Sequence, residues 1–183
     1  TQIAAKSKQH IIQPGANIMR KLFFTVLLGI FTATAHAAVS PTERQANPKA
    51  AALAQTKLSG GVRLYNYQSN GDGTYTAYLY PNTIHALGGG WYSVISRHRS
   101  QRTSPEPYML VSDWVFCGRG KHQSVMSALA LFNSDGSLYG LKDTHPYAKP
   151  TELSAATISE LNAIGGEEQH TAKMVQAVCR RAK

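Results

Sequence analysis

Long apolar segments are missing from this sequence. The most apolar one, residues 22–31 (LFFTVLLGIF), has ten residues, whereas a helix needs roughly 20 to cross the hydrocarbon core of a membrane. The sequence therefore predicts no transmembrane span. Acidic residues are also scarce, with 10 Asp and Glu against 19 Lys and Arg, and this imbalance favours contact with acidic partners.

Motifs of known chemistry are missing as well. Residues 38–183 contain no G-x-S-x-G and no H-E-x-x-H motif. The glycines at 88–90 precede a strand pattern rather than a helix, and the lysine after 118–120 is not followed directly by serine or threonine, so neither fits a phosphate-binding loop. We therefore expect no catalytic residue, no metal ion and no cofactor.

A small envelope hydrolase is the weaker alternative. Asp113, flanked by apolar residues, is the one carboxylate to test in that case, because burying it without a hydrogen bond would be costly. The histidines of this part of the chain are scattered, and we interpret them as surface or capping residues. They are His85, His98, His122, His145 and His170.

The N-terminal region is typical of an exported protein. Residues 19–21 (MRK) are positively charged, 22–31 are apolar, and 35–37 (AHA) supply the small residues of a cleavage site. This order predicts a secretory signal peptide over 19–37. Residues 1–18 precede the plausible start methionine, and we interpret them as a mis-started or non-native leader. No cysteine lies at the cleavage site, so no lipid anchor is expected.

Cysteine is rare, since only Cys117 and Cys179 are present. Exported proteins meet oxidising conditions, which favours a disulfide between the two. A zinc site would need ligands at C-x2-C or H-x3-H spacing, and neither cysteine has them. A reactive thiol stays an alternative without a supporting signature.

Cleavage after residue 37 would leave 146 of the 183 residues, enough for one domain. Residues 1–37 carry four basic and no acidic residues, so +5 of the net charge of +9 would remain. That charge suits anionic glycans, lipid headgroups or acidic protein patches, and nucleic acid is not expected for an exported protein. The composition is compatible with a homodimer but does not determine the oligomeric state.

Alternating and turn patterns predict a sheet. Residues 38–61 are rich in Ala, Pro and polar residues and are expected to be flexible, with the domain over 62–183. Strands are predicted at 62–67 and 74–80, which form a hairpin around Asn-Gly and Asp-Gly, with Pro81-Asn82 ending the second. Further strands are expected at 91–98, 108–117, 124–132 and 137–141, with 108–117 central because it is apolar on both faces. Residues 124–132 also fit a helical stripe, but Asp135-Gly136 and the strand pattern after it favour a second hairpin.

The C-terminal third is typical of helices, at 154–164 and 167–182. In the second, Thr171, Met174, Val175 and Val178 form an apolar stripe, and Cys179 faces the same way. We therefore predict an α+β fold, an antiparallel sheet of about five to six strands with a C-terminal helix packed on it and tethered by a disulfide.

Residues 97–107 are basic and punctuated by proline, which predicts a loop. Arginine engages carboxylates and sulfates through a planar fork, so this loop is our candidate contact surface, with a plain solvated loop as the alternative. The candidate ligand-binding residues are Arg97, Arg99, Arg102, Arg119 and Lys121.

An ordered set of short segments resembles the surface-adhesin protein E family of Gram-negative bacteria. The segments are YPNTI (80–84), WYSVI (91–95), YMLVSDWVFC (108–117), LFNSDGSL (131–138) and AVC (177–179). The resemblance covers residues 62–179 and implies a cysteine-terminated strand joined by a disulfide to a C-terminal helix on an antiparallel sheet. It also implies a periplasmic, secreted or surface protein that binds host extracellular-matrix or serum proteins.

The chain departs from this family in three respects. Members often carry an aspartate in the segment that matches Tyr80-Pro81-Asn82, where none stands here. An Asp-Cys dipeptide is usual where Phe116-Cys117 stands here, and many members are lipoproteins, whereas no anchoring cysteine is present. A periplasmic structural or inhibitor-type protein is a second hypothesis, because aromatic residues are numerous in a short stretch and exposed ones could recognise a partner protein. The candidates are Tyr65, Tyr67, Tyr75, Tyr78, Tyr80 and Trp91.

Overall fold

The architecture was taken from a computed structural model. It describes residues 38–69, 73–100, 107–144, 151–154, 156, 158–159 and 168–182. Several predictions lie outside these ranges: the leader predicted at 1–18, the signal peptide predicted at 19–37, Arg102, His145 and most of the helix predicted at 154–164. None of the helices in the described part is long and apolar enough to cross a membrane.

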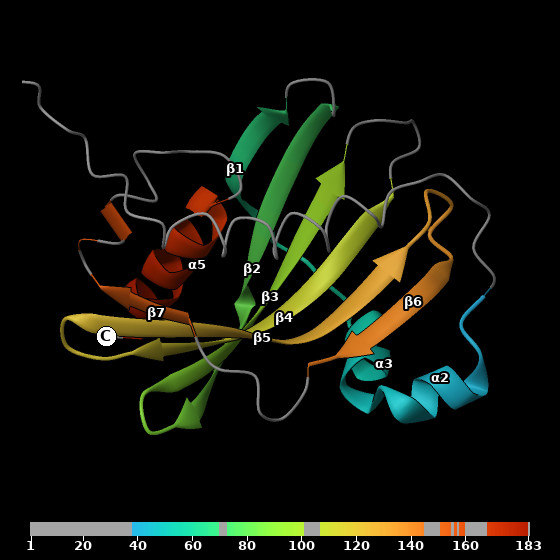
Figure 1. The fold of residues 1–183 in the computed structure, drawn as a ribbon, viewed down its shortest axis with the longest axis horizontal. Coiled ribbons are helices and arrows are strands. Elements are labelled where there is room, and N and C mark those ends of the chain that lie inside the picture. Colours follow the sequence, from blue (N-terminus) through green and yellow to red (C-terminus); the bar gives the residue numbers. More distant parts are fainter. Residues whose placement is uncertain are drawn as a thin grey trace, which may run out of the picture. The chain divides into compact units, whose positions relative to one another are not determined.

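Within the described ranges, seven antiparallel strands form one sheet, in which six consecutive strands lie side by side in chain order (Figure 1). The seventh, β7, pairs with the beginning of β5. The antiparallel sheet and the central place of 108–117 are confirmed, and the fold is mostly sheet with few helices. The strands are β1 (Val62–Ser69), β2 (Gly73–Gly88), β3 (Trp91–Ser100), β4 (Tyr108–Cys117), β5 (Lys121–Phe132), β6 (Leu138–Asp143) and β7 (Thr151–Ser154).

The predicted hairpins are confirmed. Strand β1 pairs with β2, and β5 pairs with β6. The glycines between β2 and β3 form a hairpin turn in which Gly88, Gly89 and Gly90 have φ values of 92°, 59° and 84°. Residues with a Cβ atom rarely adopt such values, which explains the glycine triplet without a phosphate ligand.

Strand β2 does not end at Pro81-Asn82, so this prediction was wrong. The β2–β3 register shifts between Tyr80 and His85, and pairing then resumes. The Thr83 hydroxyl stabilises the irregular stretch, because it donates to the Tyr80 carbonyl (2.7 Å) and accepts from the Ile95 amide (2.9 Å). The Thr83 hydroxyl thus takes the place of a β2 carbonyl as the acceptor for the Ile95 amide.

Residues 97–100 belong to β3 rather than to a loop. The predicted start of the loop at residue 97 was therefore wrong. Arg99 pairs with Thr76 on one side and with Tyr108 on the other. Pairing on both sides outweighs the local preference of a polar, basic segment for loop structure. The predicted loop at 101–106 lies outside the described residues.

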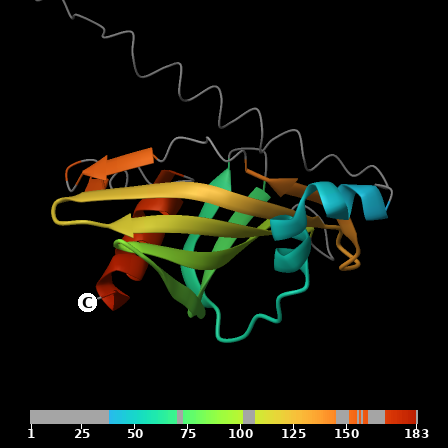
Figure 2. The ribbon, with the colours of Figure 1, turned by 90° about the horizontal axis from the view of Figure 1, so that it is seen from below.

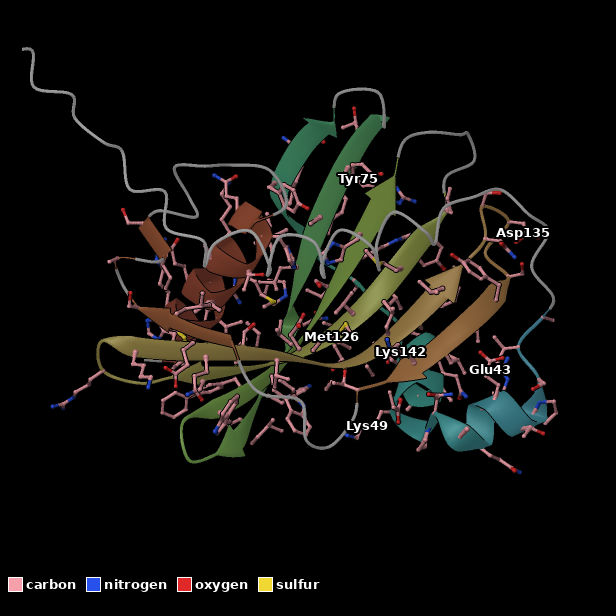
Figure 3. The ribbon with its side chains drawn as sticks, viewed as in Figure 1. Glu43, Lys49, Tyr75, Met126, Asp135 and Lys142 are labelled. Carbon is pink, nitrogen blue, oxygen red and sulfur yellow. A yellow bond between two sulfur atoms is a disulfide. The ribbon has the colours of Figure 1, made fainter. Side chains whose placement is uncertain are left out.

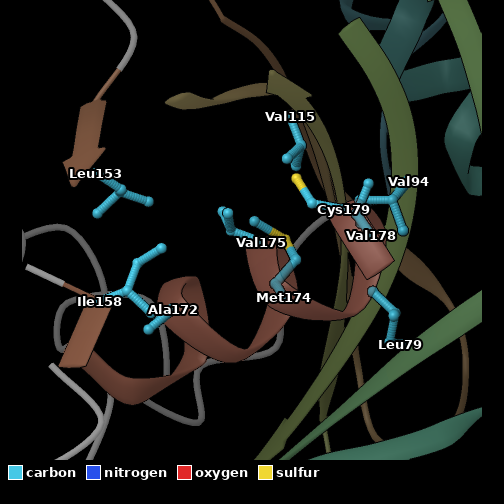
Figure 4. Close-up of a cluster of buried hydrophobic side chains, with 10 residues drawn as sticks. All are labelled: Leu79, Val94, Val115, Leu153, Ile158, Ala172, Met174, Val175, Val178 and Cys179. Carbon is cyan, nitrogen blue, oxygen red and sulfur yellow. The ribbon is translucent and has the colours of Figure 1, made fainter. Parts of the chain in front are cut away.

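The C-terminal helix α5 (Glu168–Arg181) packs on one face of the sheet, as predicted (Figure 4). Its buried side chains include Met174, Val175 and Val178, and Ala172 takes the place predicted for Thr171. They pack against Leu79, Val94, Val115, Leu153 and Ile158. The Cys117–Cys179 disulfide is confirmed, with a Cα–Cα distance of 5.4 Å, and ties the last turn of α5 to the end of β4.

The prediction that residues 38–61 are flexible was wrong for residues 41–54, which form helices α2 (Pro41–Ala46) and α3 (Pro48–Ala54). Ser40 caps α2 by accepting a hydrogen bond from the Glu43 amide (3.1 Å). Each helix has a proline in its first turn, where the missing N–H costs nothing. Local start signals therefore existed within a segment whose composition is typical of disorder.

A second core lies beneath α3. Val39, Ala50 and Leu53 are buried against residues of β4, β5 and β6, which are Leu110, Ala128, Ala130, Phe132 and Leu141. Because side chains alternate along a strand, Leu110 and Val115 lie on opposite faces of β4. We call these faces the α3 face and the α5 face. Figure 2 shows the two helical regions near opposite ends of β4 and β5.

Candidate functional site

Arg97 and Arg99 lie two positions apart on β3 and therefore share the α3 face of the sheet. Both side chains are half-buried. The Arg97 guanidinium carbon lies 3.9 Å from the centre of the Tyr108 ring, and the other side of this ring system is occupied by Phe132, which stacks on Tyr108 at 4.5 Å with 7° between the planes. Tyr108 thus holds Arg97 by a cation–π contact on a rigid strand.

Neither guanidinium group has a carboxylate partner in the described part of the chain. The Nε atoms of both Arg97 and Arg99 are buried there and lack a hydrogen-bond partner. Among the basic residues in the described ranges, Lys121 forms a salt bridge, in which its Nζ atom lies 2.8 Å from Glu152 Oε1. Two half-buried positive charges on one face, without a described counter-charge, constitute a candidate site for an anion, because desolvated ions are stable only when paired.

The other predicted binding residues do not join this pair. Arg119 and Lys121 are exposed in and beside the β4–β5 turn, whereas Arg99 pairs with Tyr108 at the opposite end of β4. Ten strand residues separate the two places, which corresponds to roughly 30 Å. Arg102 lies outside the described residues. Of the five predicted residues, the structure brings together Arg97 and Arg99.

Comparisons of the chain with protein families, with curated proteins and with solved structures found no match. The resemblance to the surface-adhesin protein E family therefore stays a prediction.

Two histidines interpreted from the sequence as surface or capping residues form a pair at the interface of β3 with α5. The rings of His98 and His170 meet edge to face with centroids 4.3 Å apart, and His98 Nε2 lies 3.1 Å from Ser96 Oγ. Burial lowers the pKa of His98 to about 4. Burial, followed by the charge of His98, lowers the pKa of His170 well below its usual value. Both are therefore neutral near pH 7.

Asp113 faces the interior. It lies on the α5 face of β4 and is 7% exposed, between Val94 and Met126 of the neighbouring strands. Burial raises the pKa of its carboxyl to about 7. In the described ranges, no three His, Cys, Asp or Glu side chains are grouped so that they could hold a metal ion.

Two of the six aromatic side chains that the second hypothesis names as candidates are not exposed. Tyr65 and Tyr80 are buried, and each is 7% exposed. A cluster forms instead on the α3 face, where Trp91 and Phe116 pack at 5.4 Å across β3 and β4. Trp114 lies two positions from Phe116 on the same face and is 38% exposed. The alternation of β4 was the sequence signal for this cluster.

One lysine extends the aromatic cluster. Lys49 of α3 places its ammonium nitrogen 5.2 Å from the centre of the Trp114 ring. Figure 3 shows Lys49 and Glu43 on the helices beside β6, where Lys142 lies. Lys49 therefore places a positive charge beside Trp114, as Arg97 does beside Tyr108.

Proposed function

We propose that this is an exported, non-enzymatic binding protein that engages an acidic extracellular partner through Arg97 and Arg99. The observation that carries this proposal is the absence of a carboxylate partner for these two half-buried guanidinium groups in the described part of the chain. Guanidinium forks bind carboxylate or sulfate groups with two parallel hydrogen bonds.

The arginines are also partly preorganised. Because Arg97 rests on Tyr108 and both residues lie on a strand paired on its two sides, binding an anion costs less side-chain entropy than it would for arginines in a mobile loop. The net charge of the chain acts in the same direction by attracting acidic partners over longer distances.

An adhesin-like role accords with this chemistry. The sheet, the C-terminal helix and the Cys117–Cys179 disulfide have the arrangement that the resemblance to the surface-adhesin protein E family implies. On this proposal the protein acts in the envelope or outside a Gram-negative cell, and host extracellular-matrix or serum proteins or anionic glycans supply the acidic groups.

The test compares two double variants with the same net charge. Arg97→Gln with Arg99→Gln removes the proposed site, and Arg119→Gln with Lys121→Gln removes two exposed charges near the opposite end of β4. Binding to immobilised heparin, a sulfated glycan, is measured at low and physiological salt. We expect at least a tenfold weaker affinity for the first variant, since a charge-assisted hydrogen bond contributes about 1.5–3 kcal/mol.

Equal losses in both double variants would show that net charge alone drives binding and would contradict the proposal. A further pair, Arg97→Lys with Arg99→Lys, keeps the charge but removes the planar fork. It should bind more weakly than the wild type if two-point hydrogen bonding matters.

A second candidate function is recognition of a protein partner by the aromatic cluster. The specific observation is Trp114, a large side chain that is 38% exposed beside Trp91 and Phe116. Tryptophan is enriched among the residues that dominate protein interfaces. Trp114→Ala should then abolish capture of a matrix or serum protein that the arginine variants still bind.

A further inference from the structure

The Cys117–Cys179 disulfide has an imidazole beside it. His122 lies directly opposite Cys117 in the β4–β5 ladder, and its Nδ1 atom is 3.8 Å from the Sγ atom of Cys179. The histidine is half-buried and therefore held in place by the strand. One sulfur atom of the disulfide has a nitrogen neighbour able to donate a proton.

The two cysteine residues differ in burial as well. Cys117 is half-buried at the end of β4, whereas Cys179 is buried in the last turn of α5. Thiol–disulfide exchange requires a thiolate to reach one sulfur while the other departs as a thiolate. His122 lies beside Cys179 Sγ, so this sulfur fits the departing thiolate, and the less buried Cys117 fits the sulfur that is attacked.

The position of Cys179 makes a proton donor necessary. A helix carries partial negative charge at its C-terminus, which disfavours a thiolate in the last turn of α5. A hydrogen-bond donor beside the departing sulfur offsets this effect, and the Nδ1 atom of His122 lies 3.8 Å from Cys179 Sγ. Arg180 and Arg181, which follow Cys179, add positive charge to the last turn of the helix.

We infer that the Cys117–Cys179 disulfide is a site of exchange with an extracellular dithiol, assisted by His122. The dithiol's thiolate attacks Cys117 Sγ, the S–S bond breaks, and its electron pair passes to Cys179 Sγ, which takes a proton from His122. The second thiol then attacks the mixed disulfide and releases Cys117. The dithiol is oxidised to its own disulfide, and the protein disulfide is reduced to two thiols.

The exchange has a structural consequence that is separate from anion binding. The disulfide ties α5 to β4, and the side chains around Cys179 form the core on the α5 face. Arg97 and Arg99 lie on the other face. Reduction would therefore loosen α5 without removing the proposed anion site, and failure of either proposal leaves the other standing.

The first experiment locates the attacked sulfur in the wild-type protein. The full chain is incubated with glutathione, free thiols are blocked by alkylation, and the mixed disulfide is mapped by mass spectrometry. We expect the glutathione adduct on Cys117. An adduct mainly on Cys179, or equally on both, would overturn the inference, and this measurement needs no variant.

The second experiment tests His122. The rate of reduction by dithiothreitol at pH 7 is followed by alkylation for the wild type, His122→Ala and His85→Ala. His85 is an exposed histidine of β2 and serves as the matched control. We expect reduction to be about tenfold slower in His122→Ala and unchanged in His85→Ala, because loss of leaving-group stabilisation slows exchange.

A His122→Ala rate equal to that of the wild type would also overturn the inference. A faster rate would do the same, since it would mean that the imidazole protects the disulfide. If His122→Ala does not fold, His122→Asn replaces it, because its amide keeps a hydrogen-bond donor but has no titratable proton. The expected rate of this variant then lies below that of the wild type.

Discussion

Asp143 joins two segments that lie far apart in the sequence. Its two carboxylate oxygens accept hydrogen bonds from the amides of Ala50 (2.7 Å) and Lys49 (3.1 Å), which belong to the first turn of α3. Its own amide donates to the Asn47 side chain (2.9 Å). A carboxylate at a helix N-terminus satisfies free amides and opposes the helix dipole, so one residue of β6 fixes α3 on the sheet.

Asp143→Ala should lower the free energy of unfolding by about 0.5–2 kcal/mol, the usual effect of losing a helix cap. Urea unfolding followed by circular dichroism measures this change. Asp143→Asn keeps one acceptor oxygen and should lose less. Equal stability of the alanine variant and the wild type would contradict a capping role.

The histidine pair shows the same kind of long-range contact at the level of single residues. His98 and His170 are far apart in the chain, and no local sequence pattern predicts that the centroids of their rings lie 4.3 Å apart. The sequence identified both residues but not their burial. Their pairing depends on how α5 docks on β3, which is a property of the fold.

At the scale of elements, local patterns predicted what local physics determines. The hairpins follow from turn residues between alternating segments, and α5 follows from one apolar stripe with arginines in its last turn. Arg97 and Arg99 were predicted as binding residues, but in a loop. They lie in a strand because β2 and β4 pair with β3 on both sides, and pairing partners are not encoded in the segment itself.

The contact between β3 and α5 makes stability depend on pH. His98 has a folded-state pKa of about 4 against an ordinary value of 6.5, so between these values only the unfolded state binds the proton. Its contribution to stability is therefore lost as the pH falls from 6.5 to 4. Asp113 has the opposite effect, because its folded-state pKa is about 7 against an ordinary value of 3.8. Between these values only the folded state holds the proton, so the contribution of Asp113 to stability falls as the pH rises from 3.8 to 7.

Two variants separate these effects. We expect His98→Gln to lose less stability than the wild type between pH 6.5 and pH 4, and Asp113→Asn to gain relative to the wild type as the pH rises from 4 to 8. Chemical unfolding at several pH values measures both. Profiles parallel to that of the wild type would contradict the assignment of these two groups.

At the scale of the whole molecule, the described fold has two cores on opposite faces of one sheet. One lies beneath α5, and the other lies beneath α3 and includes Val39 and Leu53. The domain boundary predicted at residue 62 divides the second core. Apolar side chains were too few within residues 38–61 to predict it, because most of that core comes from the sheet.

Removing residues 38–61 should therefore destabilise the domain. A chain of residues 62–183 would expose Leu110, Phe132 and Leu141, which are buried beside α3. Compared with residues 38–183, we expect a loss of at least about 2 kcal/mol, since one fully buried leucine contributes about 1.5–3 kcal/mol. Leu53→Ala in the longer chain is the matched point variant, and equal urea midpoints for the two chains would contradict the expectation.

Strand β5 has different neighbours along its outer edge. Lys121–Ser124 pair with β7, and Ala128–Phe132 pair with β6. The edge is thus divided between two short strands, one near the disulfide and the other beside α3. Fraying at the disulfide end can therefore stop before it reaches the helices at the other end, so the molecule can open locally while most of its backbone stays protected from solvent exchange.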